Sequence, residues 1–331
     1  MVTPRRVLAT LGAPALADPA RLGVDGLAVR LLEPGAEPCA RRVGRVVRAA
    51  ARHDAILLDG SERCDQAAAA LLGLRRSSPP LVLAECVWKR GSSPLDALAN
   101  RAGVRAIDRG AVTYCVLSRT ELELLPRVWG VSPARVAFTP YHYRLTAEDL
   151  REPCPPGAGV FAGGDSMRDY GPLIAAAAQV DVPVTITTVR PDVAGHRALP
   201  PNLVATGRVP HARFIDLLRG AAIVVVGLEP GIQRSAGQQT YLNAMALGKA
   251  TVVTDSPGVR DYVEDGRTGL IVPPGDAQAL AQALRWLKDP ANRAEVDALR
   301  ARARDVARTV FTPERYAASV LAVVQRALVA R

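Results

Sequence analysis

The sequence predicts an α/β protein of two Rossmann-like domains, each built on a parallel sheet. Short apolar runs alternate with longer amphipathic stretches along all 331 residues, which is the pattern of parallel strands covered by helices on both faces. The length exceeds one ordinary core and suits two domains of about 150 residues each. A segment rich in proline, Thr146–Gly159, lies near the middle and predicts a linker.

The first half predicts six strands and four helices. Strands are expected near 6–11, 26–32, 55–59, 81–86, 113–117 and 136–139. Helices are expected near 38–52, 63–74, 94–107 and 119–129. We therefore expect an N-terminal domain over 1–150.

The second half repeats the alternation. Strands are expected near 159–161, 184–188, 203–206, 222–226, 251–254 and 270–272. Helices are expected near 169–179, 211–218, 237–247, 258–264, 276–288, 290–308 and 313–329. This predicts a second domain over 151–310, followed by a C-terminal helix over 311–331 that can pack back on the first domain.

Composition narrows the class of protein. The net charge of +10 would suit nucleic acid, but almost all basic residues are arginine, aromatic residues are only 4%, and no helix-turn-helix or zinc-finger spacing occurs. No apolar run reaches the roughly 18 residues of a membrane span, and the N-terminus lacks the pattern of a signal peptide. We expect a cytoplasmic protein that does not bind nucleic acid.

Cysteine and histidine give no metal pattern. The cysteines, at 39, 64, 86, 115 and 154, are odd in number and widely spaced, which predicts reduced thiols. The histidines, at 53, 142, 196 and 211, are equally scattered. We expect no metal site.

Two glycine turns carry the chemistry. The first, Phe161-Ala-Gly-Gly-Asp-Ser-Met-Arg168, follows a strand and precedes a helix. The second, Arg234-Ser-Ala-Gly-Gln238, also opens a helix after an apolar strand. Helix starts present free N–H groups and a positive dipole end to anions. Either turn alone is also compatible with plain scaffold, but two on one sheet predict an anion site at its carboxyl edge.

A third stretch, Asp255–Asp276, holds two turns around a short helix and is interpreted mainly as scaffold. Four motifs make residues 159–327 resemble the C-terminal domain of family 4 retaining glycosyltransferases (glycosyl transferase group 1). They are Gly163-Gly-Asp-Ser-Met-Arg-Asp-Tyr170, Thr206-Gly-Arg-Val-Pro210, Ala244-Met-Ala-Leu-Gly-Lys249 and Val263-Glu-Asp-Gly-Arg-Thr-Gly-Leu-Ile-Val-Pro-Pro-Gly-Asp276. Cys115-Val-Leu-Ser-Arg-Thr-Glu121 is similar to the end of that family's N-terminal domain.

The resemblance implies a GT-B fold of two facing Rossmann-like domains with an interdomain cleft, the acceptor on the first domain and a nucleotide-diphosphate sugar on the second. No cofactor or metal is implied beyond that donor. By resemblance Arg168 would hold the diphosphate and stabilise the leaving charge. The donor contacts implied are Gly163, Gly164, Asp165, Arg168, Arg208, Val209, Arg234, Ser235, Gly237, Gln238 and Asn243.

One departure from the family pattern stands out. A glutamate pair separated by seven residues is usual there, and the matching positions are Ser235 and Asn243, neither of which ionises. Glu229, upstream on the same loop, is our candidate substitute and second catalytic residue, although a surface-loop role fits it equally. On the acceptor side, position in the chain singles out Gly12, Glu85 and Trp88.

A basic helical face, formed by Arg41, Arg45, Arg48 and Arg52, is either solvated or a peripheral contact to the inner membrane face for a lipid-linked acceptor. We therefore expect a glycosyltransferase that moves a sugar from a nucleotide-diphosphate donor to the hydroxyl of a small molecule, glycan or lipid-linked glycan. The alternatives are a nucleotide-sugar epimerase or hydrolase of the same fold, and a non-catalytic nucleotide-binding relative that lost the glutamate pair.

Overall fold

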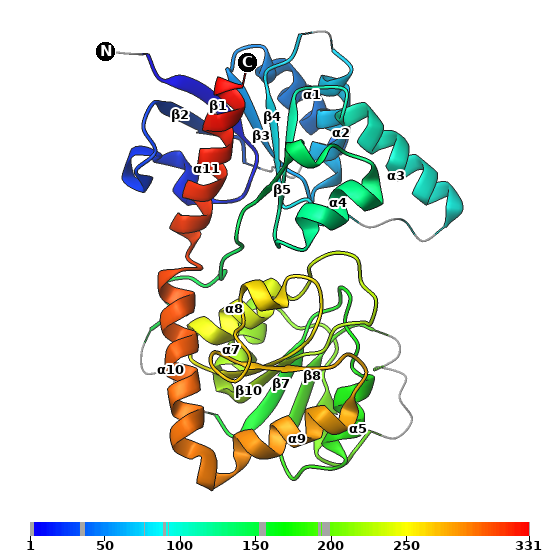
Figure 1. Cartoon of the computed structure of the whole chain (residues 1–331), viewed down its shortest axis with the longest axis vertical. Coiled ribbons are helices and arrows are strands. Elements are labelled where there is room, and N and C mark those ends of the chain that lie inside the picture. Colours follow the sequence, from blue (N-terminus) through cyan, green and yellow to red (C-terminus); the bar gives the residue numbers. More distant parts are fainter. Residues whose placement is uncertain are drawn as a thin grey trace. The chain divides into compact units, whose positions relative to one another are not determined.

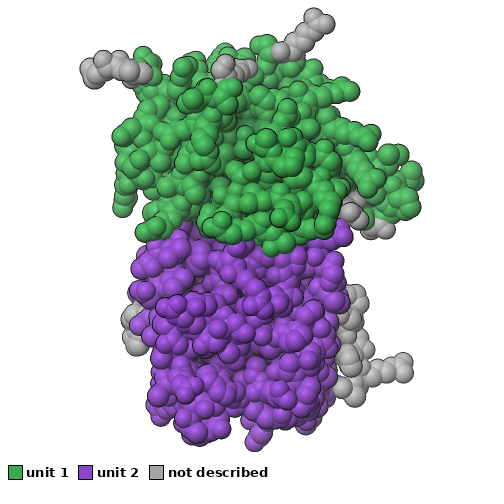
Figure 2. Space-filling model, viewed as in Figure 1, with its two compact units in different colours: residues 1–140, 313–331 green, residues 141–312 purple. Residues whose placement is uncertain are grey.

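The computed structural model describes residues 3–33, 37–75, 77–88, 91, 93–151, 157–190, 193 and 199–330. The chain divides into two compact units, shown in different colours in Figure 2. Unit 1 comprises Met1–Pro140 and Pro313–Arg331, and unit 2 comprises Tyr141–Thr312. Each unit contains one six-stranded sheet in which every neighbouring pair is parallel.

Unit 1 has the strand order β2-β1-β3-β4-β5-β6. Its strands are β1 (Arg5–Ala9), β2 (Leu27–Leu31), β3 (Ala55–Asp59), β4 (Leu81–Ala84), β5 (Val112–Val116) and β6 (Val136–Phe138). Its helices are α1 (Cys39–Ala50), α2 (Arg63–Gly73), α3 (Pro94–Ile107), α4 (Glu121–Trp129) and α11 (Pro313–Val329).

Helices cover both faces of this sheet. Along β3, Ile56 and Leu58 join the core that α1 and α2 close, whereas the fully buried Leu57 points to the opposite face because side chains alternate along a strand. On that face α11, the last helix of the chain, lies against β3, β4 and β5 (Figure 1). The last helix is therefore part of unit 1.

Unit 2 has the strand order β12-β11-β10-β7-β8-β9. Its strands are β7 (Gly159–Gly163), β8 (Val184–Thr187), β9 (Leu203–Ala205), β10 (Ala221–Val226), β11 (Ala250–Thr254) and β12 (Leu270–Val272). Its helices are α5 (Gly171–Ala177), α7 (His211–Gly220), α8 (Gln238–Ala246), α9 (Ala277–Lys288) and α10 (Arg293–Thr309). Helices α5 and α9 pack together, as do α8 and α10 (Figure 1).

The predicted fold class is confirmed: both halves are parallel α/β units. One local prediction was wrong, and one local feature was not predicted. The helix expected over 258–264 is one turn of 3₁₀ helix, Val259–Asp261, and residues 11–26 contain two unpredicted 3₁₀ turns, Pro14–Ala17 and Ala20–Leu22. A turn of three or four residues is too short to show a helical spacing of apolar residues, so its sequence does not predict it. Contacts with the surrounding chain determine such turns.

Candidate functional site

The order of strands in unit 2 places two loops at a topological switch point. From β7 the chain moves outward through β8 and β9, and from β10 it moves the other way through β11 and β12, so β7 and β10 are neighbours at the point of reversal. Loops at the carboxyl ends of such a pair diverge and leave a crevice in which open sheets bind ligands. Here those loops are the turn after Gly163 and the loop from Gly227 to Gly237.

Backbone hydrogen bonds hold the two loops together. The amide of Asp169 donates to the carbonyl of Gly227 at 3.2 Å, and the amide of Glu229 donates to the carbonyl of Met167 at 3.1 Å. Met167 has a φ of 55°, in the left-handed region that side chains other than glycine rarely enter. The turn is therefore held in an uncommon conformation directly before Arg168.

Arg168 is buried beneath this turn, with 5% of its surface exposed. Its Nη2 donates to Oγ1 of Thr240 at 3.0 Å, and its Nε donates to the carbonyl of Gly163 at 3.3 Å. Burial lowers the pKa of the guanidinium, against the opposite effect of Tyr170 and other neighbours, and arginine remains protonated in proteins. A fixed positive charge thus lies between the turn and the first turn of α8.

The start of α8 is the second half of the site. Gly237 precedes the helix with a φ of 84°, and a Cβ built on it would lie 3.3 Å from Nη1 of Arg168 and 2.8 Å from Cγ1 of Val226. Gln238 follows, buried, with no hydrogen-bond partner for its Nε2 among the described residues. The helix start directs its N–H groups and positive dipole end toward the carboxyl edge of the sheet.

Two further arginines lie on the loops at this edge of the sheet. Nη2 of Arg234 donates to Oγ of Ser166 at 2.8 Å and its Nη1 donates to the carbonyl of Ser235 at 3.1 Å, so this side chain also links the two loops. Arg190, just beyond β8, pairs with Glu229 through Nη1 and Oε1 at 2.8 Å. Three arginines from three loops therefore lie around one sheet edge.

Asp165 connects the first turn to the ends of β8 and β9. Its Oδ1 accepts hydrogen bonds from the hydroxyl of Thr188 at 2.7 Å and the amide of Val189 at 2.9 Å, and Oδ2 lies 3.9 Å from Nη2 of Arg208. Burial acts to raise the pKa of Asp165, but these hydrogen bonds and the charges of Arg208 and Arg168 outweigh it and lower the pKa. Val209, half-buried, follows Arg208.

The two positions where the glutamate pair is missing, Ser235 and Asn243, lie just before α8 and within it. Ser235 is fully buried. Asn243 is 2% exposed, and its Oδ1 accepts the amide N–H of Arg144 at 2.7 Å. The structure therefore brings Gly163, Gly164, Arg168, Arg234, Gly237 and Gln238 together at one carboxyl edge of the sheet, with Asp165, Arg208 and Glu229 beside them, while the amide oxygen of Asn243 is bonded to the first residues of unit 2.

Sequence reasoning missed three residues of this site. Thr240 accepts from Arg168, Arg190 pairs with Glu229, and Tyr170 donates from its hydroxyl to the carbonyl of Gly164 at 2.6 Å. Burial raises the pKa of Tyr170 to about 12, so it is a donor at neutral pH. The available signal was position: Arg190 lies just after β8, Tyr170 directly precedes α5, and Thr240 is in the first turn of α8.

The three acceptor-side candidates occupy different places in unit 1. Gly12 borders a small pocket of about 130 Å³ with Leu31 and Glu33. Glu85 is buried, has a φ of 55°, and its Oε1 accepts a hydrogen bond from the hydroxyl of Tyr316 on α11 at 3.1 Å. Trp88 lines a separate pocket of about 460 Å³. The structure does not gather these three residues into one site.

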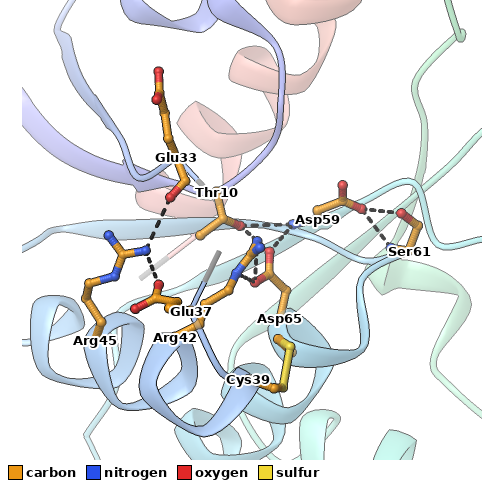
Figure 3. Close-up of polar contacts among 10 residues, drawn as sticks. Thr10, Glu33, Glu37, Cys39, Arg42, Arg45, Asp59, Ser61 and Asp65 are labelled. Atoms are coloured by element: carbon orange, nitrogen blue, oxygen red, sulfur yellow. Dashed lines mark hydrogen bonds and ion pairs between the residues drawn. A yellow bond between two sulfur atoms is a disulfide. The ribbon is translucent and has the colours of Figure 1, made fainter. Parts of the chain in front are cut away.

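The switch point of unit 1, between β1 and β3, carries a buried polar cluster (Figure 3). Asp65, fully buried, accepts from the hydroxyl of Thr10, from Nε of Arg42 at 3.0 Å and from the amide of Asp59 at 3.1 Å. Burial raises the pKa of Asp65 more than these partners lower it. Arg45, also on α1, pairs with Glu37.

The prediction of reduced cysteines was wrong for one pair. Cys39 and Cys64, which begin α1 and α2, form a disulfide beside this cluster (Figure 3). The spacing of 25 residues gave no sign of it, because only the packing of α1 against α2 brings the two helix starts together. Cys86 and Cys115 are free and buried, and burial raises the pKa of both thiols. Cys154 and His196 lie outside the described residues.

In the part of the chain that the structure describes, no group of three His, Cys, Asp or Glu side chains is placed to hold a metal ion. No helix in the described ranges is long and apolar enough to cross a membrane.

Comparison with known proteins gives one matching family and solved structures that share one fold. Residues 168–289 match the family described as glycosyl transferases group 1, and no curated protein matches the chain. Among solved structures, HepE of Anabaena in complex with UDP-glucose is 16% identical, with a TM-score of 0.70 over 97% of this chain and 100% of that one. Sucrose-phosphate synthase of Thermosynechococcus elongatus is 16% identical, with a TM-score of 0.69 over all of both chains.

A third similar structure is that of a protein named for a different activity. A putative UDP-N-acetylglucosamine 2-epimerase of Listeria monocytogenes is 14% identical, with a TM-score of 0.57 over 99% of this chain and 98% of that one. At these identities the likeness establishes the fold, which is the GT-B arrangement of two parallel α/β units. Folds of this kind host several chemistries.

Proposed function

From the premise that this chain carries a group 1 glycosyl transferase domain, we propose that it transfers a sugar from a nucleotide-diphosphate donor to an acceptor hydroxyl. The observation that carries the proposal is the convergence of two glycine turns on Arg168 at the switch point of unit 2. In the reaction the bond between the anomeric carbon and the diphosphate oxygen breaks, a bond from the acceptor oxygen to that carbon forms, the acceptor hydroxyl gives its proton to a base in the site, and the nucleoside diphosphate leaves.

The crevice suits the charge that this reaction creates. A diphosphate leaving group gains negative charge as its bond to the sugar breaks, and groups fixed in advance stabilise that charge without reorganising. The start of α8 at Gly237 offers N–H groups, while Arg168 and Arg234 supply fixed positive charge. We propose that these groups hold the diphosphate with Gly163, Gly164, Ser235 and Gln238, and that they do so without a metal ion.

Glu229 is the proposed carboxylate of the site. It lies on the loop after β10, and its pairing with Arg190 fixes its position at the end of β8. The carboxylate can accept the acceptor's proton or stabilise positive charge on the transferred sugar, which are tasks that Ser235 and Asn243 cannot perform. Retention of configuration is part of the proposal.

The nucleoside is proposed to extend toward β9. Asp165 ties the first turn to Thr188 and approaches Arg208, and Val209 follows with a half-buried side chain. We propose that Arg208 and Val209 border the base. Asn243 is proposed to reach the ribose through its amide group, whose oxygen accepts a hydrogen bond from Arg144.

The acceptor is proposed to bind to unit 1, with Gly12, Glu85 and Trp88 as starting candidates. A cytoplasmic enzyme in peripheral contact with the inner membrane face remains part of the proposal, because Arg41, Arg48 and Arg52 are exposed on or just beyond α1. Arg42 and Arg45 are already paired with Asp65 and Glu37. Flotation with anionic and neutral liposomes tests this contact, and absence of binding at low salt would rule it out.

A donor panel tests the central proposal. Thermal shift with UDP-glucose, GDP-mannose and dTDP-glucose identifies the donor, because a ligand of the folded state raises the apparent stability. With that donor, release of nucleoside diphosphate should rise when acceptor sugars are added and should not change with a chelator. Arg168→Lys keeps the charge and loses the planar contacts, so it should retain stability better than turnover.

Other outcomes of the donor assays would favour the alternative functions. Free sugar formed from the donor without acceptor indicates a hydrolase, and an inverted sugar centre in the recovered donor indicates an epimerase. Binding without turnover of the donor indicates a non-catalytic relative. If none of the three donors shifts the melting temperature, the proposed diphosphate site is wrong.

A further inference from the structure

A pocket of about 460 Å³ lies within unit 1, lined largely by α2 and α3. Its walls are formed by the first two turns of α2 and by the middle and C-terminal end of α3, and Trp88 and Trp129 complete it from the segment after β4 and from the last residue of α4. Its volume is that of an ordinary small-molecule site, which ranges over roughly 300–1,000 Å³. The buried polar cluster around Asp65 does not line it.

The two tryptophans are fixed by neighbours and remain half-buried. Their ring centroids are 5.6 Å apart at an interplanar angle of 88°, and Trp88 packs in the same edge-on manner on Tyr114. Nε1 of Trp88 donates to the carbonyl of Gly60 at 2.7 Å, so its one polar atom is already satisfied. Trp88 therefore presents carbon surface to the pocket, and its packing on Trp129 holds that surface in a defined position.

Polar side chains accompany that carbon surface. Arg63, Gln66 and Asn100 line the same pocket, and Nε2 of Gln66 donates to the carbonyl of Gly60 at 2.8 Å, which orients the amide. Among the described residues that line the pocket, Arg63 is the one with a formal charge, and no carboxylate is present. The lining therefore disfavours a cationic ligand and offers both donors and acceptors to hydroxyl groups.

We propose that this pocket binds a pyranose ring of the acceptor, uncharged or anionic. A pyranose exposes C–H groups on its faces and hydroxyls around its edge, which complements indole carbon beside amide and guanidinium groups. The assignment of this ring to the acceptor rests on the proposed function. Binding itself involves unit 1 alone, and it can be measured without a donor.

The tryptophans of the chain allow sugar binding in the pocket to be measured directly. It has three tryptophans, of which Trp88 and Trp129 line the pocket and Trp286 belongs to α9 of unit 2. Protein labelled with 5-fluorotryptophan should give three fluorine NMR resonances, assigned by single Trp→Phe variants. The probes are the methyl glycosides of glucose, galactose, mannose and N-acetylglucosamine. We expect at least one to move the Trp88 and Trp129 resonances saturably while the Trp286 resonance stays still.

Gly103→Leu provides the pocket-filling variant. Gly103 lines the pocket within α3, and a Cβ built there meets nothing within 4 Å, so the larger side chain enters open space without a backbone clash. Because leucine favours a helix over glycine, the variant should fold at least as stably. We expect it to weaken glycoside binding at least tenfold. Arg105→Leu, exposed on the same helix and outside the pocket, is the matched control and should bind like the natural chain.

The outcomes separate this inference from the proposed function. If no glycoside moves the two resonances, or if Gly103→Leu binds as tightly as Arg105→Leu, the pocket assignment is wrong, whatever the donor assays give. If glycosides bind but neither transfer nor donor binding is found, the sugar site stands and the proposed function fails. In a transfer assay, Gly103→Leu should raise the acceptor KM at least tenfold and leave the thermal shift by donor unchanged.

Discussion

Nη2 of Arg168, in the turn after β7, donates a hydrogen bond to Oγ1 of Thr240, in the first turn of α8, at 3.0 Å. The guanidinium of Arg168 thus contacts both glycine turns. Both partners are more than nine-tenths buried, so the contact is protected from solvent and fixes the distance between the two anion-binding elements.

Thr240→Val should expose how much the fold depends on this contact. Valine keeps the shape and removes the acceptor, which leaves a buried charged donor short of one partner and should cost about 1–3 kcal/mol of unfolding free energy. Urea unfolding measures the change, and Thr240→Ser is the rescue variant because it keeps the hydroxyl. Arg168 also donates to the carbonyls of Gly163 and Ser166. Equal stability of the valine variant and the natural chain would show that these two carbonyls satisfy Arg168 by themselves.

Gly237→Ala should damage the donor site more than a comparable glycine substitution nearby. Gly237 and Gly231 both have positive φ, 84° and 71°, and alanine in that region costs about 1–2 kcal/mol at either position. A Cβ at Gly237 would also lie 2.8 Å from Val226 and 3.3 Å from Arg168, whereas at Gly231 it meets nothing within 4 Å.

The two variants therefore separate backbone strain from close approach. Calorimetric titration with the donor found by thermal shift should give at least tenfold weaker binding for Gly237→Ala and a near-natural affinity for Gly231→Ala. Similar losses in both variants would mean that the whole loop, and not the helix start, determines donor affinity.

Glu229→Gln tests the proposed carboxylate. The ion pair with Arg190 is about a third exposed, so its loss should change the unfolding free energy by less than about 1 kcal/mol. If the carboxylate takes part in proton transfer, kcat should fall about a hundredfold with a smaller change in donor KM. Arg190→Gln is the paired control: a loss of kcat as large as that of Glu229→Gln would assign the effect to the ion pair instead.

Asp165→Asn should show a defined pH dependence. The pKa of Asp165 is lowered from its ordinary value of 3.8, so the ionised carboxyl stabilises the fold above pH 3.8, and this contribution is lost as the pH falls through the lower folded value. The stability difference between the natural chain and Asp165→Asn should be constant at neutral pH and shrink below pH 3.8. Denaturant melts across the acid range measure it, and a difference that grows on acidification would contradict the assigned hydrogen bonds.

Reduction of the Cys39–Cys64 disulfide should destabilise unit 1. Opening a cross-link between residues 25 positions apart restores chain entropy to the unfolded state, worth about 3 kcal/mol. Melting curves with and without a reductant, compared with Cys39→Ser/Cys64→Ser, test this. The double variant should melt like the reduced chain, and reductant should no longer change its melting temperature. If reductant still lowered the melting temperature of the double variant, the destabilisation would not come from this disulfide.

Some features of the site followed from the sequence because they depend on local pattern. Apolar runs of strand length separated by amphipathic stretches determined two parallel sheets, and in a parallel sheet all carboxyl ends lie at one edge. The turn at Gly163 and the turn at Gly237 therefore had to lie at the same edge of unit 2. Their glycines are needed for positive φ and close approach, which are properties of the backbone itself.

Other features depended on contacts between distant residues. Thr240 beneath Arg168, Arg190 beside Glu229, the disulfide at Cys39 and Cys64, and the pairing of Trp88 with Trp129 each join positions from different elements. No local propensity encodes such pairs, because loop conformation and helix packing select them only when the core forms. The sequence alone determined the fold class and the edge of the sheet that carries the proposed donor site, while the tertiary structure decided which side chains meet there.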